Sequence, residues 1–347
     1  MFNFQKEKML FAEHLSLLIK GGTTLNEALD ILKEESKSRT FKKALDSVSK
    51  RILEGESLNK SLARYPKIFN KFFQNVVKVG EESGTLEENL KYLSLCLKNQ
   101  YSLKQKLLGA LMYPIIVIAL ALVIVSGTMI FILPKLFTTL NVIEAQLPLS
   151  TKILFGISVF IQKYWIFLIV IFIFLILIYK IFNYIKITRF YFHKIIFFMP
   201  FFGTTNKNSN LAEFSRVFFT LLKSGVPILE AFDICNETVT SDVYKKYLKL
   251  VKARVEKGQK LSKSFKAFPK IFPSIFSQMI LVGEKSGTLE ESMSYLAEFY
   301  EQEADSALKN FSAIIEPILL ILVGFFVAFI ALSIITPIYQ ITSNLSQ

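Results

Sequence analysis

The sequence contains little of the chemistry that enzymes and metal sites use. Of its 347 residues, two are histidines (His14 and His193) and two are cysteines (Cys96 and Cys235). Neither pair has the spacing of a metal site or a redox motif, and no Ser–His–Asp or Cys–His set can be assembled. A P-loop and a G-x-G-x-x-G motif are also missing. We therefore expect a protein that is not an enzyme and that carries no cofactor or metal.

Charged residues are scarce as well, at 20%, whereas hydrophobic residues reach 52% and the mean hydropathy is +0.42. Disordered chains have low hydrophobicity, so the composition excludes that class. Three stretches with almost no charge carry the excess, namely 107–134, 164–185 and 310–337. A helix of about 20 apolar residues crosses the hydrocarbon core of a bilayer. The sequence therefore predicts three transmembrane helices over these residues.

The basic residues beside the predicted spans favour one orientation in the membrane. Eight of them flank one side, against only Lys135, Lys152 and Lys163 on the other. Because cytosolic flanks are enriched in Lys and Arg, we expect residues 1–106 and 186–309 in the cytosol. Residues 135–163 then form an external loop, residues 338–347 form an external tail, and the mixed basic and aromatic segment 186–203 lies at the interface. Acids alternate with the lysines in both cytosolic blocks, so the net charge of +13 does not indicate direct binding of nucleic acid.

One segment of the chain occurs twice at a constant offset of 203 residues. FAEHLSLLIKGGTTLNEALDILKEES from Phe11 resembles FSRVFFTLLKSGVPILEAFDICNETV from Phe214. The register holds without a gap and also pairs special residues: Gly22 with Gly225, Pro114 with Pro317, and Pro134 with Pro337. The repeated unit is therefore a cytosolic domain together with the span that follows it. With one connecting span between them, the two copies have the same orientation, unlike the inverted repeats of many transporters.

Each cytosolic copy is expected to be helical, which gives an all-α fold class. In the first copy the apolar spacing predicts helices over Phe4–Lys20, Leu25–Glu35 and Phe69–Val79, with one helix ending at Gly55 and a short one ending before Pro66. Thr24-x-x-Glu27 and Thr85-x-x-Glu88 have the pattern of capping boxes. Nothing interrupts the helix that begins after Thr85 before Leu133, although Pro114 should kink it. A helix of that length would tie the cytosolic domain rigidly to the first span.

The most distinctive polar motif, G-E-[EK]-S-G-T-L-E-E, occurs once in each copy. Its residues are Gly80, Glu81, Ser83, Gly84, Glu87 and Glu88, and then Gly283, Glu284, Ser286, Gly287, Glu290 and Glu291. A structural interpretation is favoured, in which the glycines end one helix and the acids stabilise the start of the next. A carboxylate patch made with Glu82 that binds a partner is the second interpretation, and a cation site is the third.

Glu316 is the only charged residue of the third apolar stretch. An ionisable residue in a span is by default a functional hypothesis. Its position just before Pro317 favours the wet cytosolic edge of the membrane, and its equivalent in the first copy is the uncharged Tyr113. The alternative is a contact with another protein inside the membrane.

These motifs together carry a family resemblance. They include LLKSGVPILEAFDI (221–234), both acidic motifs, MYP (112–114), LPLSTKILFGISVFIQKYW (147–165) and MPFFG (199–203). The chain resembles the inner-membrane platform proteins of type IV pilus, type II secretion and competence pseudopilus machines, of the PilC/GspF type. The resemblance implies a multi-pass, non-enzymatic scaffold in the cytoplasmic membrane, with its N-terminus in the cytosol and its C-terminus outside.

The same resemblance implies a set of partners. The cytosolic domains would engage a hexameric assembly ATPase, and the spans would guide pilin or pseudopilin subunits into or out of a filament. Other inner-membrane assembly proteins and further copies of the chain, as a dimer or trimer, would complete the assembly. The sequence leaves open whether the machine extends pili, secretes proteins or takes up DNA.

A secondary transporter or channel built from a parallel duplicated repeat is the alternative function. Transporters place polar residues and broken helices near the middle of the membrane. The first predicted span offers only Ser126, Gly127 and Thr128, and the third offers Gly324 and Ser333. No ion pathway can be drawn through these residues. A membrane-bound enzyme is disfavoured because no nucleophile–base set is present.

Overall fold

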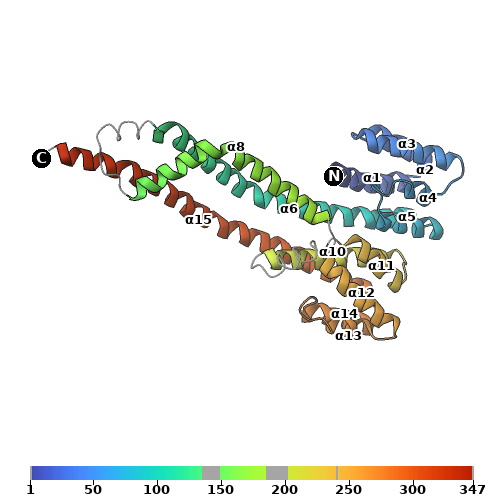
Figure 1. Ribbon diagram of the computed structural model, residues 1–347. Helices are drawn as coiled ribbons and strands as arrows, with labels where there is room; N and C mark the ends of the chain where they lie inside the picture. Colours follow the sequence, from blue (N-terminus) through green and yellow to red (C-terminus); the bar gives the residue numbers. More distant parts are fainter. Residues whose placement is uncertain (1, 135–148, 185–201, 240, 346–347) are drawn as a thin grey trace. The chain divides into compact units, whose positions relative to one another are not determined.

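A computed structural model describes residues 2–134, 149–184, 202–239 and 241–345 of the chain. Every regular element among these residues is a helix (Figure 1), which confirms the expected all-α class. The chain divides into two compact units. The first consists of Met1–Lys106 and Phe190–Ala307, and the second of Leu107–Arg189 and Leu308–Gln347. The first unit therefore contains both copies of the predicted cytosolic domain, and the second contains the apolar stretches.

The two copies in the first unit have the same series of helices. The first copy has α1 (Phe2–Lys20), α2 (Leu25–Glu35), α3 (Arg39–Leu53), α4 (Leu58–Ala63), α5 (Lys71–Ser83) and the start of α6 (Leu86–Gly127). The second copy has α10 (Phe202–Lys223), α11 (Ile228–Thr238), α12 (Asp242–Glu256), α13 (Leu261–Lys266), α14 (Ser274–Ser286) and the start of α15 (Leu289–Leu345). From α2 to α5, every helix begins and ends 203 residues before its counterpart. The sequence repeat is thus a structural repeat as well.

Local capping explains where the helices of the first copy begin. Thr24 and Glu27 form the predicted capping box, in which the Glu27 N–H donates to Thr24 Oγ1 at 3.4 Å and the Thr24 N–H donates to the Glu27 carboxylate at 3.2 Å. The second copy has Pro227 at the position of Thr24, and α11 begins directly after it at Ile228. Proline suits this position because an N–H there would have no partner within the helix.

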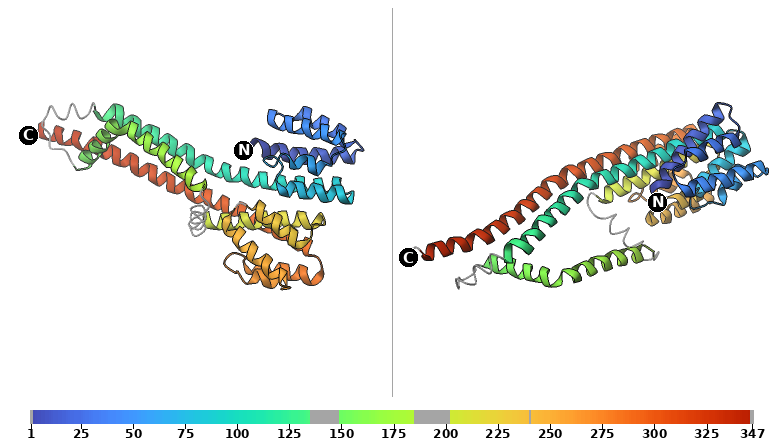
Figure 2. Two further views of the ribbon diagram at one scale, coloured as in Figure 1. Left: turned by 45° about the vertical axis from the view of Figure 1, so that its right-hand side comes forward. Right: turned by 90° about the horizontal axis from the view of Figure 1, so that it is seen from above.

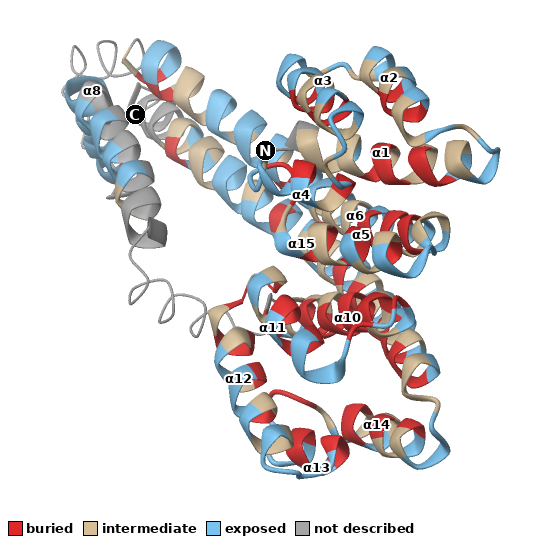
Figure 3. Cartoon of the chain, turned by 90° about the vertical axis from the view of Figure 1, so that its right-hand side faces the viewer, coloured by how far each residue is buried: buried red, intermediate tan, exposed pale blue. Residues whose placement is uncertain are grey.

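Phenylalanine side chains fill the core of the first unit. Phe11 contacts Phe41 with ring centroids 5.9 Å apart, and in the second copy Phe265 contacts Phe272 at 4.7 Å. Buried residues of both copies belong to one continuous hydrophobic cluster. Figure 3 shows in red the buried stretches of α1, α5 and α10 that contribute to it. Such aromatic pairs stabilise a core beyond the area that they bury.

Helices α6 and α15 each continue from the first unit into the second (Figure 2). Helix α6 is followed directly by a π-helical turn, η1 (Thr128–Ile132), so the predicted helix up to Leu133 is uninterrupted. The two helices that are long and apolar enough to cross a membrane, among the residues searched, are Leu86–Ile132 and Leu289–Thr336. The third predicted span, 164–185, is not among them and stays a prediction.

The second unit also contains α8 (Leu149–Tyr184), which changes direction at Tyr164 (φ −117°, ψ 16°). Its polar side chains bond to backbone carbonyls of neighbouring helices. Thr151 Oγ1 donates to the Ser333 carbonyl at 2.9 Å, and Ser158 Oγ donates to the Met129 carbonyl at 2.7 Å. Hydrogen bonds of this kind hold helices together in an apolar environment.

The structure describes only parts of the predicted external loop, interfacial segment and external tail. The expected external loop 135–163 contains helical residues from Leu149 onward, because α8 begins there. Its residues 135–148 lie outside the described residues, as do 186–201 of the expected interfacial segment and the last two residues of the expected tail.

Candidate functional site

The first glutamate of each acidic motif binds the start of a short helix. In the first copy, Glu81 accepts hydrogen bonds from the N–H groups of Leu58 and Asn59, at 2.5 Å and 2.8 Å. These N–H groups open α4, a six-residue helix whose first donors have no partner within the helix. Glu81, on α5, thus accepts hydrogen bonds from the free N–H groups at the start of α4. Its local sequence does not reveal this role.

The second copy repeats this arrangement with Glu284. Its carboxylate accepts from the N–H groups of Leu261 (2.7 Å) and Ser262 (3.3 Å) and from the Ser262 hydroxyl at 2.5 Å. Burial by itself raises the pKa of Glu284, but these hydrogen bonds outweigh it and the pKa lies below its ordinary value. The carboxylate is therefore held ionised at the start of α13.

The glycines of the motif have two different roles. Gly84 and Gly287 end α5 and α14 in the left-handed conformation, at φ 72° and 75°. Gly80 and Gly283 instead lie inside these helices, so the expectation that all four glycines form the break is wrong for this pair. A Cβ at Gly80 would lie 3.0 Å from Leu86 Cα, and one at Gly283 would lie 2.9 Å from Leu289 Cα. The buried glycines therefore allow each helix to approach the next one closely.

The remaining acids of the motif lie at the surface near the starts of α6 and α15. Glu82 is exposed and 4.0 Å from Lys78, Glu88 accepts a bond from the Tyr92 hydroxyl at 3.0 Å, and Glu290 lies 3.8 Å from Lys223. Acids at a helix start interact favourably with its dipole. The hydroxyls of the motif pair within each turn: Ser83 with Thr85, and Ser286 with Thr288, each at 2.6 Å. No group of three or more His, Cys, Asp or Glu side chains in the part of the chain that the structure describes could hold a metal ion.

The two copies are joined by a polar and aromatic interface that sequence reasoning did not find. Lys71 of α5 pairs with Glu237 of α11 at 2.7 Å, and Lys106 of α6 pairs with Asp305 of α15 at 3.0 Å. The ring of Tyr92 meets that of Phe219 edge to face, with centroids 6.2 Å apart. Together with the common core, these contacts make the two repeats one packed body.

One ion pair at this interface is partly buried. Arg216 of α10 binds Glu301 of α15, and Asn99 of α6 donates to the same carboxylate at 3.3 Å. The equivalent positions in the first copy are Glu13 and Lys98, with the charges exchanged. This exchange of charges between equivalent positions was the available sequence signal.

Both cysteines are buried in the first unit. Burial raises the pKa of Cys96 to about 12 and also raises the pKa of Cys235 well above its ordinary value. Thiols with such pKa values stay protonated and unreactive. Cys96 and Cys235 are both free thiols.

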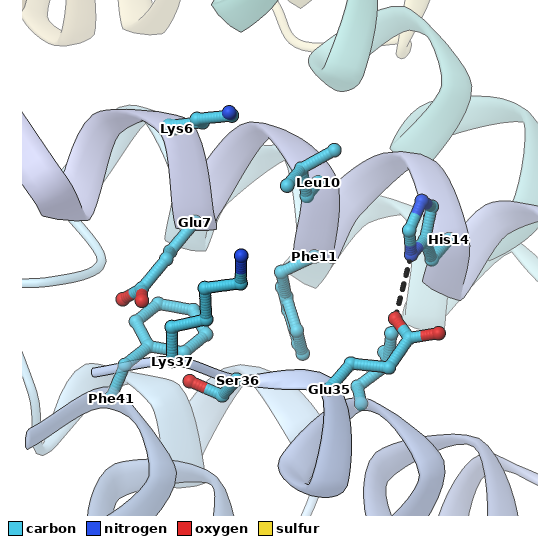
Figure 4. A pocket seen from close by; sticks show the side chains of 10 residues that line it. Lys6, Glu7, Leu10, Phe11, His14, Glu35, Ser36, Lys37 and Phe41 are labelled. Carbon is cyan, nitrogen blue, oxygen red and sulfur yellow. Dashed lines mark hydrogen bonds and ion pairs between the residues drawn. The ribbon is translucent and has the colours of Figure 1, made fainter. Parts of the chain in front are cut away.

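A pocket of about 220 Å³ lies between α1, α2 and the segment that leads to α3 (Figure 4). His14 Nδ1 and the Glu35 carboxylate are 2.9 Å apart at one side of it. At the other side burial raises the pKa of Glu7, although the Ser38 N–H donates to its carboxylate at 2.8 Å. The second copy has Val217 and Thr238 at the positions of His14 and Glu35, so it cannot form the same pair of side chains.

Comparison with known proteins decides the family. The family model described as "Type II secretion system (T2SS), protein F" matches residues 11–134 and again residues 214–337. The chain belongs to this family. It is 30% identical to the type IV pilus assembly protein PilC of Thermus thermophilus, over 98% of this chain and 84% of that protein. It is also 29% identical to PilC of Pseudomonas aeruginosa (96% and 89%) and 28% identical to type II secretion system protein F of Aeromonas hydrophila (97% and 87%).

The family match has the same boundaries as the internal repeat. The two matched segments begin and end 203 residues apart, so each protein F domain includes helices of the first unit and the apolar helix that follows them. Pro114 and Pro317 lie within α6 and α15, Pro134 follows η1, and Pro337 lies near the end of α15. Glu316 is exposed in α15. Every predicted membrane proline therefore belongs to a protein F domain.

Proposed function

We propose that this chain is the inner-membrane platform of a type IV pilus or type II secretion machine. In this role it couples a cytosolic hexameric assembly ATPase to the insertion of pilin or pseudopilin subunits into a filament or to their removal from it. The observation that carries the proposal is that the helices of the two protein F domains share one hydrophobic core, and that each domain continues into a long apolar helix without a break. The platform is a scaffold and performs no catalysis of its own.

The packing of the two copies supports three membrane spans. The ion pairs Lys71–Glu237 and Lys106–Asp305 require both copies to lie on the same side of the membrane. Helix α6 crosses once after the first copy, so the chain must cross again before α10. We propose that this crossing is made by the apolar part of α8, 164–184, which lies between them in the chain. Helix α15 then makes the third crossing, which leaves the N-terminus in the cytosol and the C-terminus outside.

Continuous helices give the platform a means of transmitting motion. Helix α15 has 57 residues, about 85 Å at a rise of 1.5 Å per residue. We propose that these helices carry a displacement of the cytosolic body to the membrane. The exposed acids near the starts of α6 and α15, including Glu82 and Glu88, provide a surface for the ATPase. The spans, with apolar side chains such as Phe131 (70% exposed) and Ile321 (72% exposed), are available to lipid, to pilin helices and to other inner-membrane assembly proteins.

Site-specific photo-crosslinking in native membranes tests this function. A photoreactive amino acid at Glu82 or Lys285, which are exposed at equivalent positions of the two motifs, should crosslink the full chain to the hexameric ATPase. The same group at Lys152, on the proposed external side, is the matched control and should not. Substrate-coupled ion flux in proteoliposomes of the purified chain would instead support the transporter alternative and contradict the platform.

A further inference from the structure

The contact between the two copies joins two different faces of the repeat. Face A, in the first copy, is formed by α5 and α6 and includes Lys71, Val79, Tyr92 and Cys96. Face B, in the second copy, is formed by α10 and α11 and includes Phe219, Thr220, Gly225, Ile234 and Glu237. A Cβ added at Gly225 would lie 4.0 Å from Val79 Cγ1. Helix α11 also packs against α5.

This contact is not reciprocal. In a two-fold arrangement the same residues, exchanged between the copies, would also meet. The residues equivalent to Thr220 and Ile234 are Leu17 and Ile31. Thr220 and Ile234 are 1% and 4% exposed, whereas Leu17 is 62% and Ile31 is 42% exposed. The interface is therefore heterologous: face A of one copy meets face B of the other.

Among the residues that the structure describes, the duplication consequently leaves one further version of each face uncovered. Face B of the first copy has Leu17, Ile31 and Glu34 on α1 and α2. Face A of the second copy has Ser274 and Val282 on α14 and Tyr295 on α15. Val282 is 55% exposed and Tyr295 is 49% exposed, although each is equivalent to a residue that packs against the other copy. Large apolar side chains that gather on a surface mark a binding site.

We propose that face A of the second copy binds face B of the first copy in another molecule of this chain. The occupant is a second copy because the other version of each face already joins its partner within one molecule, although Ser16 and Ser274 replace Phe219 and Lys71 at the equivalent positions. Successive chains then associate head to tail, and a heterologous contact of this kind closes into a ring when its rotation allows it. In such an assembly, first and second copies alternate, and each added chain contributes one of each.

Polar residues at the edge of the interface are compatible with this pairing. Within the chain, the Asn99 amide donates to Glu301. At the proposed contact the equivalent residues are Gln302 and Lys98, both exposed. An amide can accept a hydrogen bond as well as donate one, so Gln302 can bind Lys98 although the charge is reversed. The ion pair Lys71–Glu237 has no counterpart, since Ser274 replaces the lysine, so the contact between chains is weaker than the contact within one.

Cysteine crosslinking between differently tagged chains tests the proposal. One full-length chain carries Glu34→Cys and the other carries Ser274→Cys, positions equivalent to Glu237 and Lys71, and both are expressed in one membrane. A short bismaleimide should give mixed dimers of the two chains and no dimers of either chain alone. The double variant in a single chain should give a ladder of multimers. The native cysteines are buried, so the wild-type chain reports any background. A double variant, Lys71→Cys with Glu237→Cys in one chain, is the positive control. It shows whether the reagent can bridge the equivalent distance within a molecule.

A second pair of variants tests the surfaces themselves. Leu17→Glu in one chain or Val282→Glu in the other should lower the yield of mixed dimers by about tenfold or more, because each places a charge in the apolar contact. Both residues are exposed, so the folded state should survive, and an unchanged unfolding temperature of the full chain verifies this. Dimers formed by Glu34→Cys or Ser274→Cys alone would indicate a two-fold contact and overturn the proposal. So would the absence of mixed dimers while the control within one chain reacts, or crosslinking of these positions to a different protein.

Discussion

The Arg216 guanidinium binds the Glu301 carboxylate through two parallel hydrogen bonds, of 2.9 Å from Nε and 2.8 Å from Nη2. The two side chains are only 11% and 25% exposed. Burial by itself lowers the pKa of Arg216, but the bonds to Glu301 outweigh it and raise the pKa, so the pair stays ionised. Because Asn99 of the first copy shares the same carboxylate, this pair helps to join the two protein F domains.

Arg216→Met should destabilise the packed body formed by the two copies. We expect the free energy of unfolding to fall by about 2–3 kcal/mol, because the Glu301 charge stays partly buried after its two donors are lost. Thermal unfolding of the full chain in detergent measures this. Lys71→Met is the matched control, since the Lys71–Glu237 pair has a similar distance of 2.7 Å but side chains that are 65% and 49% exposed. Its loss should be about 0–1 kcal/mol, and equal losses for the two variants would contradict the account.

Alanine at the buried glycines Gly80 and Gly283 should lower stability, because it pushes α5 away from α6 and α14 away from α15. For Gly283→Ala and Gly80→Ala we expect losses of about 1–3 kcal/mol, because the new methyl group meets backbone atoms that cannot move aside easily. Gly109→Ala in α6 is the control, since no atom lies within 4 Å of its added Cβ. That variant should lose no stability. If unfolding shows Gly283→Ala to be as stable as Gly109→Ala, the close approach of α14 and α15 does not require the glycine.

The lowered pKa of Glu284 predicts a specific dependence on pH. A carboxylate whose pKa is lower in the folded chain contributes stability in full above its ordinary pKa of about 4.3, and loses that contribution as the pH falls through the lowered value. Glu284→Gln should therefore be less stable than the wild type at pH 6, and this difference should shrink below about pH 4. Urea unfolding at a series of pH values measures the difference. Glu82→Gln, at an exposed position near the end of α5, should show no such difference. A stability difference for Glu284→Gln that stays constant with pH would count against the capping role.

Labelling of single cysteines tests the three-span topology. Lys152→Cys should react with a membrane-impermeable maleimide on intact spheroplasts. Lys67→Cys and Lys263→Cys, exposed positions in the two copies, should react only after the membrane is opened. External labelling of Lys263→Cys would place the second copy outside and contradict the common cytosolic body.

Local rules predicted most of the helices, because their determinants are close in sequence. Leu25–Glu35 was predicted with its observed bounds since Thr24 and Glu27 form a complete capping signal within four residues. The end of α5 was placed too early because Gly80 looks like a stop, whereas its role is a contact with Leu86 in the next helix. The capping of α4 by Glu81 could not be predicted, since the two meet only after α4 and α5 pack.

The interface between the copies lay beyond sequence reasoning for a related reason. Periodicity identifies a buried face but does not say which face of another helix covers it. Leu17 and Thr220 occupy equivalent positions, and the more polar of the two is the one that is buried. Only the packed arrangement of the two copies reveals this asymmetry.

The most direct test of the platform function is filament assembly in a strain from which this chain has been deleted. The account predicts that pilin or pseudopilin subunits remain in the inner membrane while no filament appears by electron microscopy, and that the wild-type chain restores assembly. Filaments of normal number and length in the deletion strain would contradict it.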